Sequence, residues 1–237
     1  MKSKYGFILI KPQLGENIGA SARSLKNFGF TKLILVSPKH GWPNHKAKIT
    51  SVGAYDLIKK TKIYENTQDA VSQFDIIFSL SARKRDINKK HISMNEFKKM
   101  VSKKKLNYGF MFGPEASGLS NEDLSYSNYV IKIPTSKKLK SLNLSHSLTI
   151  ICYEIFKIIN TNKFNKQSKK IKISSKKNVS AVVDHLKKLL EKKSFFNPAE
   201  KKQAMIENIN NLFYRLEPND KELRILASII STLAKNK

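Results

Sequence analysis

Residues 5–36 read YGFILIKPQLGENIGASARSLKNFGFTKLILV, and this stretch decides the fold class. Its first part, Tyr5–Ile10, is a short apolar run that ends at a Lys-Pro pair, as expected of a buried strand. Residues 18–28 follow with apolar side chains at helical spacing, and residues 32–36 form a second apolar run of strand length. A strand, a helix and a strand in this order predict a parallel β-α-β unit.

The alternation of strand and helix continues to about residue 160. It predicts an α/β fold with a mostly parallel sheet and helices on both faces. The further strands are expected at residues 75–80, 107–112 and 128–133, and the further helices around residues 51–60, 93–103 and 145–159.

The C-terminal third of the chain is expected to be helical. Residues 161–180 are polar and rich in lysine without any periodicity, which is typical of a linker. Beyond them, Asn219 with Glu222 forms a capping-box pattern, and Asn197 with Glu200 predicts another helix start. The expected organisation is a domain at 1–160, a lysine-rich linker at 161–180 and a small all-helical extension at 181–237.

The chain of 237 residues is strongly basic, with 45 Lys and Arg against 18 Asp and Glu and a net charge of +27. This charge predicts a polyanionic partner, because phosphate contacts release counterions and give affinity that does not depend on sequence. The alternative is a solvated lysine-rich surface, which we favour for most individual lysines. For the chain as a whole, the net charge makes nucleic acid the expected partner. A membrane surface is less favoured, because the lysines do not follow one amphipathic helix.

Composition also excludes several classes of protein. Apolar residues make up 40% of the chain, as in globular proteins. The longest apolar run, residues 148–156, is too short to span a membrane and contains Glu154. The single cysteine, Cys152, excludes an internal disulfide and suits a reducing compartment, and no secretory leader opens the chain. We therefore expect a soluble, cytoplasmic protein.

Familiar cofactor and metal motifs are missing from the sequence. No GxGxxG follows the first strand, and residues 113–118 have the spacing of a phosphate loop but lack its lysine, which Leu119 replaces. One cysteine and five scattered histidines offer no cluster of metal ligands, so no metal is expected.

Three loop segments remain that combine glycines with polar residues. The first, residues 15–23 (GENIGASAR), places free backbone N–H groups at a strand-to-helix turn, where an anion is favoured, and ends at Arg23. The second, residues 112–119 (FGPEASGL), follows a predicted strand at the edge where open α/β sheets bind ligands. The third, residues 133–144, connects a strand end to a helix start. Taken alone, the first segment is also compatible with an ordinary surface arginine at a helix start. The second is compatible with a simple turn, and the third with a capped helix.

Together these segments resemble the signature motifs of the SpoU-type branch of the SPOUT RNA methyltransferases. ENIGASARSLKNFGF (16–30) is similar to the first motif, FGPEASGLSNEDL (112–124) to the second, and IPTSKKLKSLNLSHSLTIICYEIF (133–156) to the third. Their order and rough spacing also agree. Within the family, the chain looks most like bacterial tRNA ribose methyltransferases, whose C-terminal helical extension its tail resembles. Pro114 departs from the pattern, since the family often has Arg there.

The resemblance implies a C-terminal trefoil knot in the α/β domain and a homodimer. It implies that S-adenosylmethionine donates a methyl group to a ribose 2′-OH of tRNA, with cytidine or uridine 32 of the anticodon loop as the favoured target. The same chemistry on rRNA or at another tRNA position stays open, as does a noncatalytic RNA-binding protein of this fold. A binder of small nucleotides is least favoured because of the charge.

Carried over position by position, the resemblance also assigns catalytic residues. Arg23 of the first motif would be the central group, with Asn17 and Glu115 beside it. Because a guanidinium is essentially never deprotonated in proteins, we expect Arg23 to hold a phosphate and orient the 2′-OH. Glu115 is expected to bond to Arg23, and Asn17 is expected to fix Arg23 or the phosphate.

The same comparison assigns RNA-binding and cofactor-binding residues. Arg83 and Arg85, with Lys84, Lys89 and Lys90, would line the RNA side of the cofactor mouth. The pocket for S-adenosylmethionine would combine small residues and apolar walls from three loops. Its expected members are Leu80, Ser81, Ala82, Gly113, Ile133, Lys140, Ser141, Leu142 and Asn143.

Overall fold

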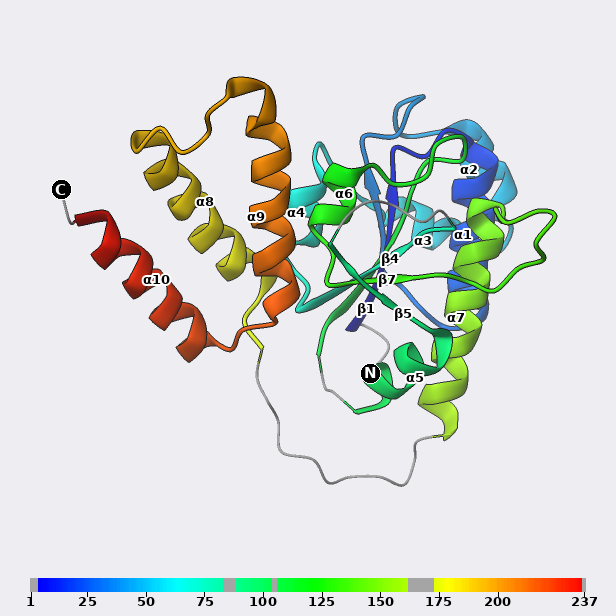
Figure 1. Cartoon of the computed structure of the whole chain (residues 1–237). Helices are drawn as coiled ribbons and strands as arrows, with labels where there is room; N and C mark the ends of the chain where they lie inside the picture. Colours follow the sequence, from blue (N-terminus) through cyan, green and yellow to red (C-terminus); the bar gives the residue numbers. More distant parts are fainter. Residues whose placement is uncertain (1–3, 83–87, 104–105, 162–172, 236–237) are drawn as a thin grey trace.

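The computed structural model describes residues 4–82, 88–103, 106–161 and 173–235 (Figure 1). Its strands are β1 (Tyr5–Ile10), β2 (Leu33–Val36), β3 (Lys62–Tyr64), β4 (Ile76–Leu80), β5 (Lys90–Ile92), β6 (Tyr108–Phe112) and β7 (Tyr129–Ile131). They form one seven-stranded sheet in the order β3-β2-β1-β6-β4-β7-β5. Every pairing in it is parallel, as the alternation of strand and helix predicted.

Strand β1 shows how the sheet separates two cores. Its side chains alternate between the two faces, as in any strand. Phe7 and Leu9 belong to one buried apolar cluster, whereas Ile8 and Ile10 belong to the other. A strand buried on both faces must be apolar throughout, which explains the unbroken run Tyr5–Ile10.

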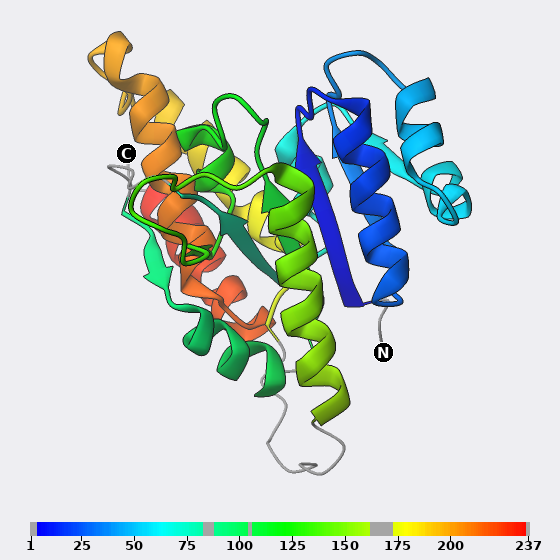
Figure 2. The ribbon, with the colours of Figure 1, turned by 90° about the vertical axis from the view of Figure 1, so that its right-hand side faces the viewer.

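Five helices cover the first face of the sheet. Ile18, Ala22 and Leu25 of the first helix and Leu148 and Ile151 of the last are all buried in the first cluster. Figure 2 shows this last helix beside the first, in front of the sheet. The five helices are α1 (Gly15–Asn27), α2 (His45–Thr50), α3 (Tyr55–Lys59), α5 (Met94–Lys103) and α7 (Leu144–Thr161).

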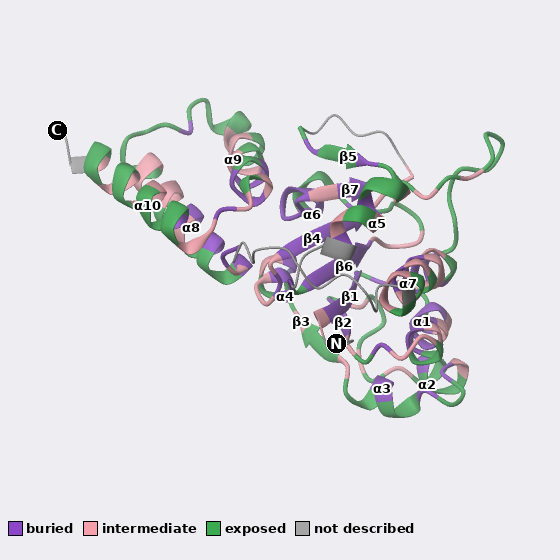
Figure 3. Cartoon of the chain, turned by 90° about the horizontal axis from the view of Figure 1, so that it is seen from below, coloured by how far each residue is buried: buried purple, intermediate pink, exposed green. Residues whose placement is uncertain are grey.

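The second face is covered mainly by the C-terminal helices. Val179, Val183, Phe213 and Tyr214 pack in the second cluster together with strand residues such as Ile8. The sheet therefore lies between the C-terminal helices and α1, α2, α3 and α7, as the view from below shows (Figure 3). The helices of this face are α4 (Thr67–Val71), α6 (Asn121–Ser125), α8 (Lys176–Lys192), α9 (Lys202–Leu216) and α10 (Asp220–Lys235).

Several local expectations differ from the structure. Of the helix expected around residues 51–60, only α3 at Tyr55–Lys59 is helical, because the chain turns between Ser51 and Ala54; α2 lies before this range and was not predicted. Helix α8 starts at Lys176, where the Ser175 hydroxyl accepts a hydrogen bond from the Asn178 N–H, so the end of the expected linker is helical. Residues 162–172 of that linker lie outside the described part. The three-residue strands β3 and β5 were not predicted, because they are too short to show a pattern.

Of the two expected capping signals, one is confirmed. The Glu222 N–H donates to Asn219 Oδ1 at 2.9 Å, and the Asn219 N–H donates to Glu222 Oε2 at 2.7 Å, which is a capping box at the start of α10. The cap expected at Asn197 is wrong. Its side-chain amide donates to the Ser194 carbonyl, and a 3₁₀ turn at Ala199–Lys201 leads into α9 instead.

The trefoil knot implied by the family resemblance stays a prediction. Within the described ranges, no helix has the length and apolarity needed to cross a membrane. The same part of the chain contains no group of three or more His, Cys, Asp or Glu side chains that could hold a metal ion.

Candidate functional site

A pocket of about 180 Å³ lies at the carboxyl ends of β4, β6 and β7. This is the edge at which open α/β sheets bind ligands. Phe112, Ile131 and Leu144 give it buried apolar walls, and the third-motif loop adds polar groups. Eight of the nine residues expected to bind the cofactor line it: Leu80, Ser81, Ala82, Gly113, Ile133, Lys140, Ser141 and Leu142.

The second-motif loop folds tightly on itself at the pocket. A Cβ on Gly113 would lie 2.2 Å from the backbone nitrogen of Leu119 and 2.4 Å from the carbonyl carbon of Gly118. Gly118 has φ of +68°, which glycine adopts readily, and its N–H donates to the Pro114 carbonyl at 2.8 Å. The loop therefore depends on its two glycines and on its backbone, so Pro114 is compatible with it.

Glu115 joins this loop to the first motif. One carboxylate oxygen accepts the Gln13 N–H at 2.8 Å. The other accepts the Leu14 N–H at 3.2 Å and the side-chain amide of Asn17 at 2.8 Å. The turn that precedes α1 is thus held against the pocket by one carboxylate, and hydrogen bonds to an ionised acceptor are stronger than neutral ones.

Asn143 brings the third motif to the same place. Its side-chain amide donates to Asn17 Oδ1 at 3.0 Å. Its oxygen accepts from the N–H and the hydroxyl of Ser145 at 2.9 and 2.8 Å, which caps the first turn of α7. Asn143 is not among the residues that line the pocket. It caps the helix behind it and connects the first and third motifs.

Arg23 lies on the exposed surface of α1 and makes no hydrogen bond or ion pair within the described ranges. The bond expected between Glu115 and Arg23 is wrong. Glu115 binds the start of α1, and Arg23 is six residues beyond Asn17, which is about 9 Å along a helix. Next to Arg23, the hydroxyls of Ser24 and Thr149 are 2.6 Å apart and link α1 to α7.

The sequence motifs did not predict Gln13 as a residue of the site. Besides its main-chain bond to Glu115, its side-chain oxygen accepts the Ala116 N–H at 3.1 Å. Gln13 therefore connects the first and second motifs from both its backbone and its side chain. No local pattern could have found it, because its partners are about a hundred positions away along the chain.

The structure describes only two of the residues expected on the RNA side, Lys89 and Lys90. Arg83, Lys84 and Arg85 lie outside the described residues, so their assignment stays a prediction. Lys90 is exposed at the start of β5. Lys89 is only 6% exposed, and its expected place on the RNA side is wrong.

Lys89 instead points into the protein. Its Nζ atom donates hydrogen bonds to the carbonyls of Ser125, Ser127 and Asn211, at distances of 2.8, 2.6 and 3.4 Å. Burial, and then the charges of Lys176 and Arg215, lower the pKa of Lys89 to about 6. The family resemblance implied a surface role for Lys89, but only tertiary contacts could show its burial.

The fold and the site correspond to a known class of enzyme. Residues 5–153 match the model of the SpoU rRNA Methylase family, and the chain belongs to this family of RNA methylases. The resemblance seen in the three motifs is confirmed by this match.

Individual relatives carry a more specific name. The chain is 32% identical over 160 residues to "tRNA (cytidine-2'-O-)-methyltransferase TrmJ" of Methanocaldococcus jannaschii, covering 66% of this chain and 69% of that protein. It is 28% identical over 232 residues to "tRNA (cytidine/uridine-2'-O-)-methyltransferase TrmJ" of Photorhabdus laumondii, covering 96% of this chain and 95% of that protein. The crystal structure of TrmJ from Z. mobilis ZM4 is similar with a TM-score of 0.88 and 28% identity, covering 97% of this chain and 99% of that one.

Proposed function

We propose that this protein transfers a methyl group from S-adenosylmethionine to the ribose 2′-OH of cytidine or uridine 32 in the anticodon loop of tRNA. The observation that carries the proposal is the meeting of all three motifs at one pocket. Glu115 and Asn143 both bond to Asn17, so the second and third motifs hold the start of the helix that carries Arg23. The likeness to TrmJ proteins over nearly the full chain supports tRNA as the substrate.

The side chains that line the pocket suit the chemistry of the methyl donor. Small residues at Ser81, Ala82 and Gly113 and apolar walls at Phe112 and Ile131 suit an adenine ring, while the loop backbones offer hydrogen bonds to its edge. When bound, S-adenosylmethionine would supply a methyl group on a sulfonium that leaves without protonation. Lys140, Ser141 and Leu142 would close the third side of the pocket, and Asn143 would support them from behind.

Arg23 has the properties required of a group that orients the RNA. Its side chain is exposed and makes no polar contact within the described chain, so its fork of N–H donors is available to a phosphate. Asn17, held by Glu115 and Asn143, fixes the first turn of α1. In our proposal, Arg23 grips the phosphate beside the target ribose and aligns the 2′-oxygen with the methyl group.

RNA binding also draws on charge outside the pocket. Arg83 and Arg85 are proposed to contact RNA beside the opening of the cofactor pocket. The lysines of the extension would add nonspecific electrostatic contacts with RNA phosphates. A homodimer, as the family resemblance implies, is part of the proposal.

The experiment that tests the proposal is methyl transfer from labelled S-adenosylmethionine to an unmodified tRNA pool, followed by alkaline hydrolysis. A 2′-O-methyl group blocks cleavage at the next phosphate, so we expect the label in alkali-resistant dinucleotides that begin with C or U. Mapping the label to position 32 completes the test.

Other results have distinct meanings. Label in rRNA and none in tRNA would keep the chemistry and overturn the substrate. Label in tRNA that alkali releases as mononucleotides would overturn ribose methylation. Binding of RNA without any binding of S-adenosylmethionine would favour a noncatalytic RNA-binding protein.

A further inference from the structure

Another pocket, of about 370 Å³, lies between the turn after β1 and the segment that leads from β2 into α2. Its volume is within the range of about 300–1,000 Å³ that is usual for pockets that bind small molecules. It lies at the same edge of the sheet as the cofactor pocket, where parallel strands end. The residues that line this α1–α2 pocket are Gln13, Leu14, Gly15, Glu16, His40, Asn44, His45 and Lys46.

One short turn of the chain separates the α1–α2 pocket from the cofactor pocket. Gln13 and Leu14 line the former, and their N–H groups donate to Glu115, which lines the latter. The side-chain oxygen of Gln13 accepts the N–H of Ala116, which also lines the cofactor pocket. A ligand that extends beyond the cofactor pocket in this direction would therefore reach the α1–α2 pocket.

Close packing of α1 against α2 fixes the walls of the α1–α2 pocket. The side chain of Asn44 accepts the Ala47 N–H at 3.1 Å and so caps α2. A Cβ on Gly15 would lie 2.1 Å from Asn44 Oδ1, so a side chain at position 15 would displace this cap. The Thr50 hydroxyl donates to the Glu16 carbonyl at 3.3 Å. These contacts hold the walls in place without help from a ligand.

The rings in the α1–α2 pocket suit the flat faces of a nucleobase. His40 and His45 are exposed, and their imidazoles make no hydrogen bond or ion pair within the described ranges. Imidazole rings are among the side chains on which unpaired bases stack in RNA recognition. Leu14, which is 49% exposed, adds an apolar surface beside them.

An ion pair in the lining suits the edge of a base. Lys46 Nζ and Glu16 Oε1 are 2.9 Å apart, and the two side chains are 68% and 44% exposed. Base edges present donors beside acceptors, which a carboxylate and an ammonium can bind respectively. A carboxylate at this place disfavours a phosphate, because like charges repel. The lining therefore favours a base over the backbone of the RNA.

The α1–α2 pocket and Arg23 also lie along one face of α1. Glu16 and Arg23 are seven residues apart, which is two helical turns and about 10 Å along the axis. In the proposed function, Arg23 grips the phosphate beside the target ribose. A strand that runs from there along α1 would bring a neighbouring base to the pocket.

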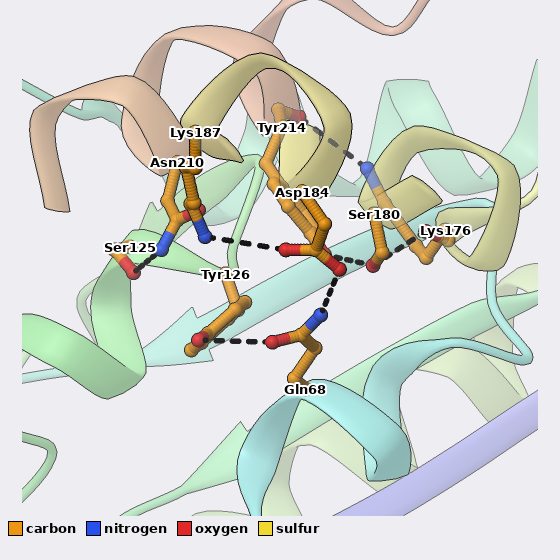
Figure 4. Close-up of polar contacts among 9 residues, drawn as sticks. All are labelled: Gln68, Ser125, Tyr126, Lys176, Ser180, Asp184, Lys187, Asn210 and Tyr214. Atoms are coloured by element: carbon orange, nitrogen blue, oxygen red, sulfur yellow. Dashed lines mark hydrogen bonds and ion pairs between the residues drawn. The ribbon is translucent and has the colours of Figure 1, made fainter. Parts of the chain in front are cut away.

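The contacts between the C-terminal extension and the other face of the sheet offer a base less (Figure 4). The amide of Gln68 donates to Asp184 Oδ2 at 3.1 Å, and the hydroxyls of Ser180 and Tyr214 are bonded to each other. Polar groups that bind one another inside the protein are not free to recognise a base. The imidazoles of the α1–α2 pocket have no such partners.

We propose that the α1–α2 pocket is a subsite for a nucleobase of the RNA strand that carries the target ribose. The base lies against the imidazoles of His40 and His45, and its edge meets the ion pair of Glu16 and Lys46. This inference rests on the proposed function, to which it adds a place where the sequence beside the target is recognised.

Affinity for RNA tests the subsite directly. His40→Ala and His45→Ala should each raise the Kd for unmodified tRNA about tenfold, because each removes a ring on which the base stacks. The affinity for S-adenosylmethionine should stay within about twofold of wild type. His185→Ala is the matched control, because it removes an exposed imidazole from α8, on the other face of the sheet. If both pocket variants bind tRNA as His185→Ala does, the proposal is overturned.

Glu16→Gln distinguishes a base from a phosphate in the pocket. Loss of the carboxylate should weaken the binding of a base whose donors it accepts, but strengthen that of a phosphate that it repels. Glu122→Gln, at an exposed position of α6, controls for the change in net charge. We expect a higher Kd for tRNA in Glu16→Gln than in Glu122→Gln, and a lower one would overturn the proposal.

A double-mutant cycle between protein and RNA identifies the base. Stem-loop RNAs of the anticodon arm carry one abasic nucleotide, which keeps the ribose and phosphate, at each loop position other than the target. We expect one abasic position to raise the Kd of wild type about tenfold and to leave that of His45→Ala unchanged, because both changes remove the same contact. Abasic positions that weaken both proteins equally, or neither, would overturn the subsite.

These affinities do not depend on methyl transfer, so they separate the subsite from the proposed function. Coupling of His45 to one base of an RNA that gains no 2′-O-methyl group would keep the subsite and overturn the proposed function. Methylation at position 32 without any such coupling would overturn the subsite and keep the proposed function.

Discussion

Glu115 receives three hydrogen bonds from the turn that starts α1, two of them from main-chain N–H groups. A carboxylate accepts such bonds with both oxygens and with its full charge. At the scale of single residues, the site is therefore assembled by a carboxylate that accepts hydrogen bonds from a distant part of the chain, and the exposed Arg23 is left available for RNA.

We predict that Glu115→Gln weakens both the fold and the pocket. The amide keeps the shape but turns an N–H₂ group toward N–H donors, so the free energy of unfolding should fall by about 1–3 kcal/mol. The affinity for S-adenosylmethionine should also fall, because Glu115 lines the pocket. Urea unfolding and a binding titration measure the two effects. Glu122→Gln, at an exposed position of α6, is the control, and wild-type behaviour of Glu115→Gln would contradict the linking role.

Arg23→Ala should separate catalysis from binding and stability. Because Arg23 is exposed and without polar contacts in the described chain, the unfolding midpoint and the affinity for S-adenosylmethionine should stay at their wild-type values. Turnover should fall by about 100-fold or more, as when a group that stabilises the transition state is removed. Arg23→Lys keeps the charge but loses the planar fork of donors, so its turnover should be little higher than that of Arg23→Ala. Normal initial rates of methyl transfer in Arg23→Ala would refute its role.

At the scale of elements, the buried polar contacts lie where α6 and α9 meet the end of the β4–β5 connection. Lys89 and Lys176 both lie in this region, and burial lowers their pKa values to about 6 and about 7, from 10.5. Between these values and 10.5 the unfolded chain binds more protons than the folded one, so the free energy of unfolding rises with pH.

We therefore predict that Lys89→Met flattens the pH dependence of stability. In wild type, Lys89 contributes a slope of at most about 1.4 kcal/mol per pH unit, and this contribution is lost progressively as the pH falls toward about 6. Urea unfolding from about pH 7 to about pH 9 measures the slope in the variant and in wild type. Lys90→Met, at the exposed neighbouring position, should leave the slope unchanged. An equal slope in Lys89→Met and wild type would show that Lys89 does not titrate in this window.

At the scale of the whole molecule, the extension completes the core of the sheet. Val179, Val183, Phe213 and Tyr214 bury the side of the strands that carries Ile8. Each buried side chain of this size contributes about 1.5–3 kcal/mol. Four of them together approach the entire stability of a typical domain, about 5–15 kcal/mol.

A chain that ends after residue 161 should therefore fail to fold stably. We expect it to aggregate or to lose cooperative unfolding, because the second face of the sheet would be exposed to water. A chain that ends after residue 218 is the control, since it retains Val179, Val183, Phe213 and Tyr214 and loses with α10 only one fully buried member of the second cluster, Leu223. Circular dichroism and sedimentation compare the two. A truncated chain that ends at residue 161 and unfolds cooperatively would show that the first domain is independent.

The sequence by itself determined the fold class, because a strand buried on both faces has to be apolar along its length and a helix shows its period locally. The run Tyr5–Ile10, the two elements after it and the capping box at Asn219 are all local patterns of this kind. The three motifs were also sufficient to identify the family.

Tertiary structure alone decided which residues meet. The partners of Glu115 lie about a hundred positions away in the chain, and Lys89 is buried by a helix more than a hundred positions beyond it. Lysine in a basic sequence predicts an exposed charge, and only its tertiary contacts with α9 and the end of α6 remove Lys89 from water. The extension likewise covers the sheet because its apolar faces pack against those of the strands. The periodicity of a helix shows that it has an apolar face, but not which distant segment that face covers.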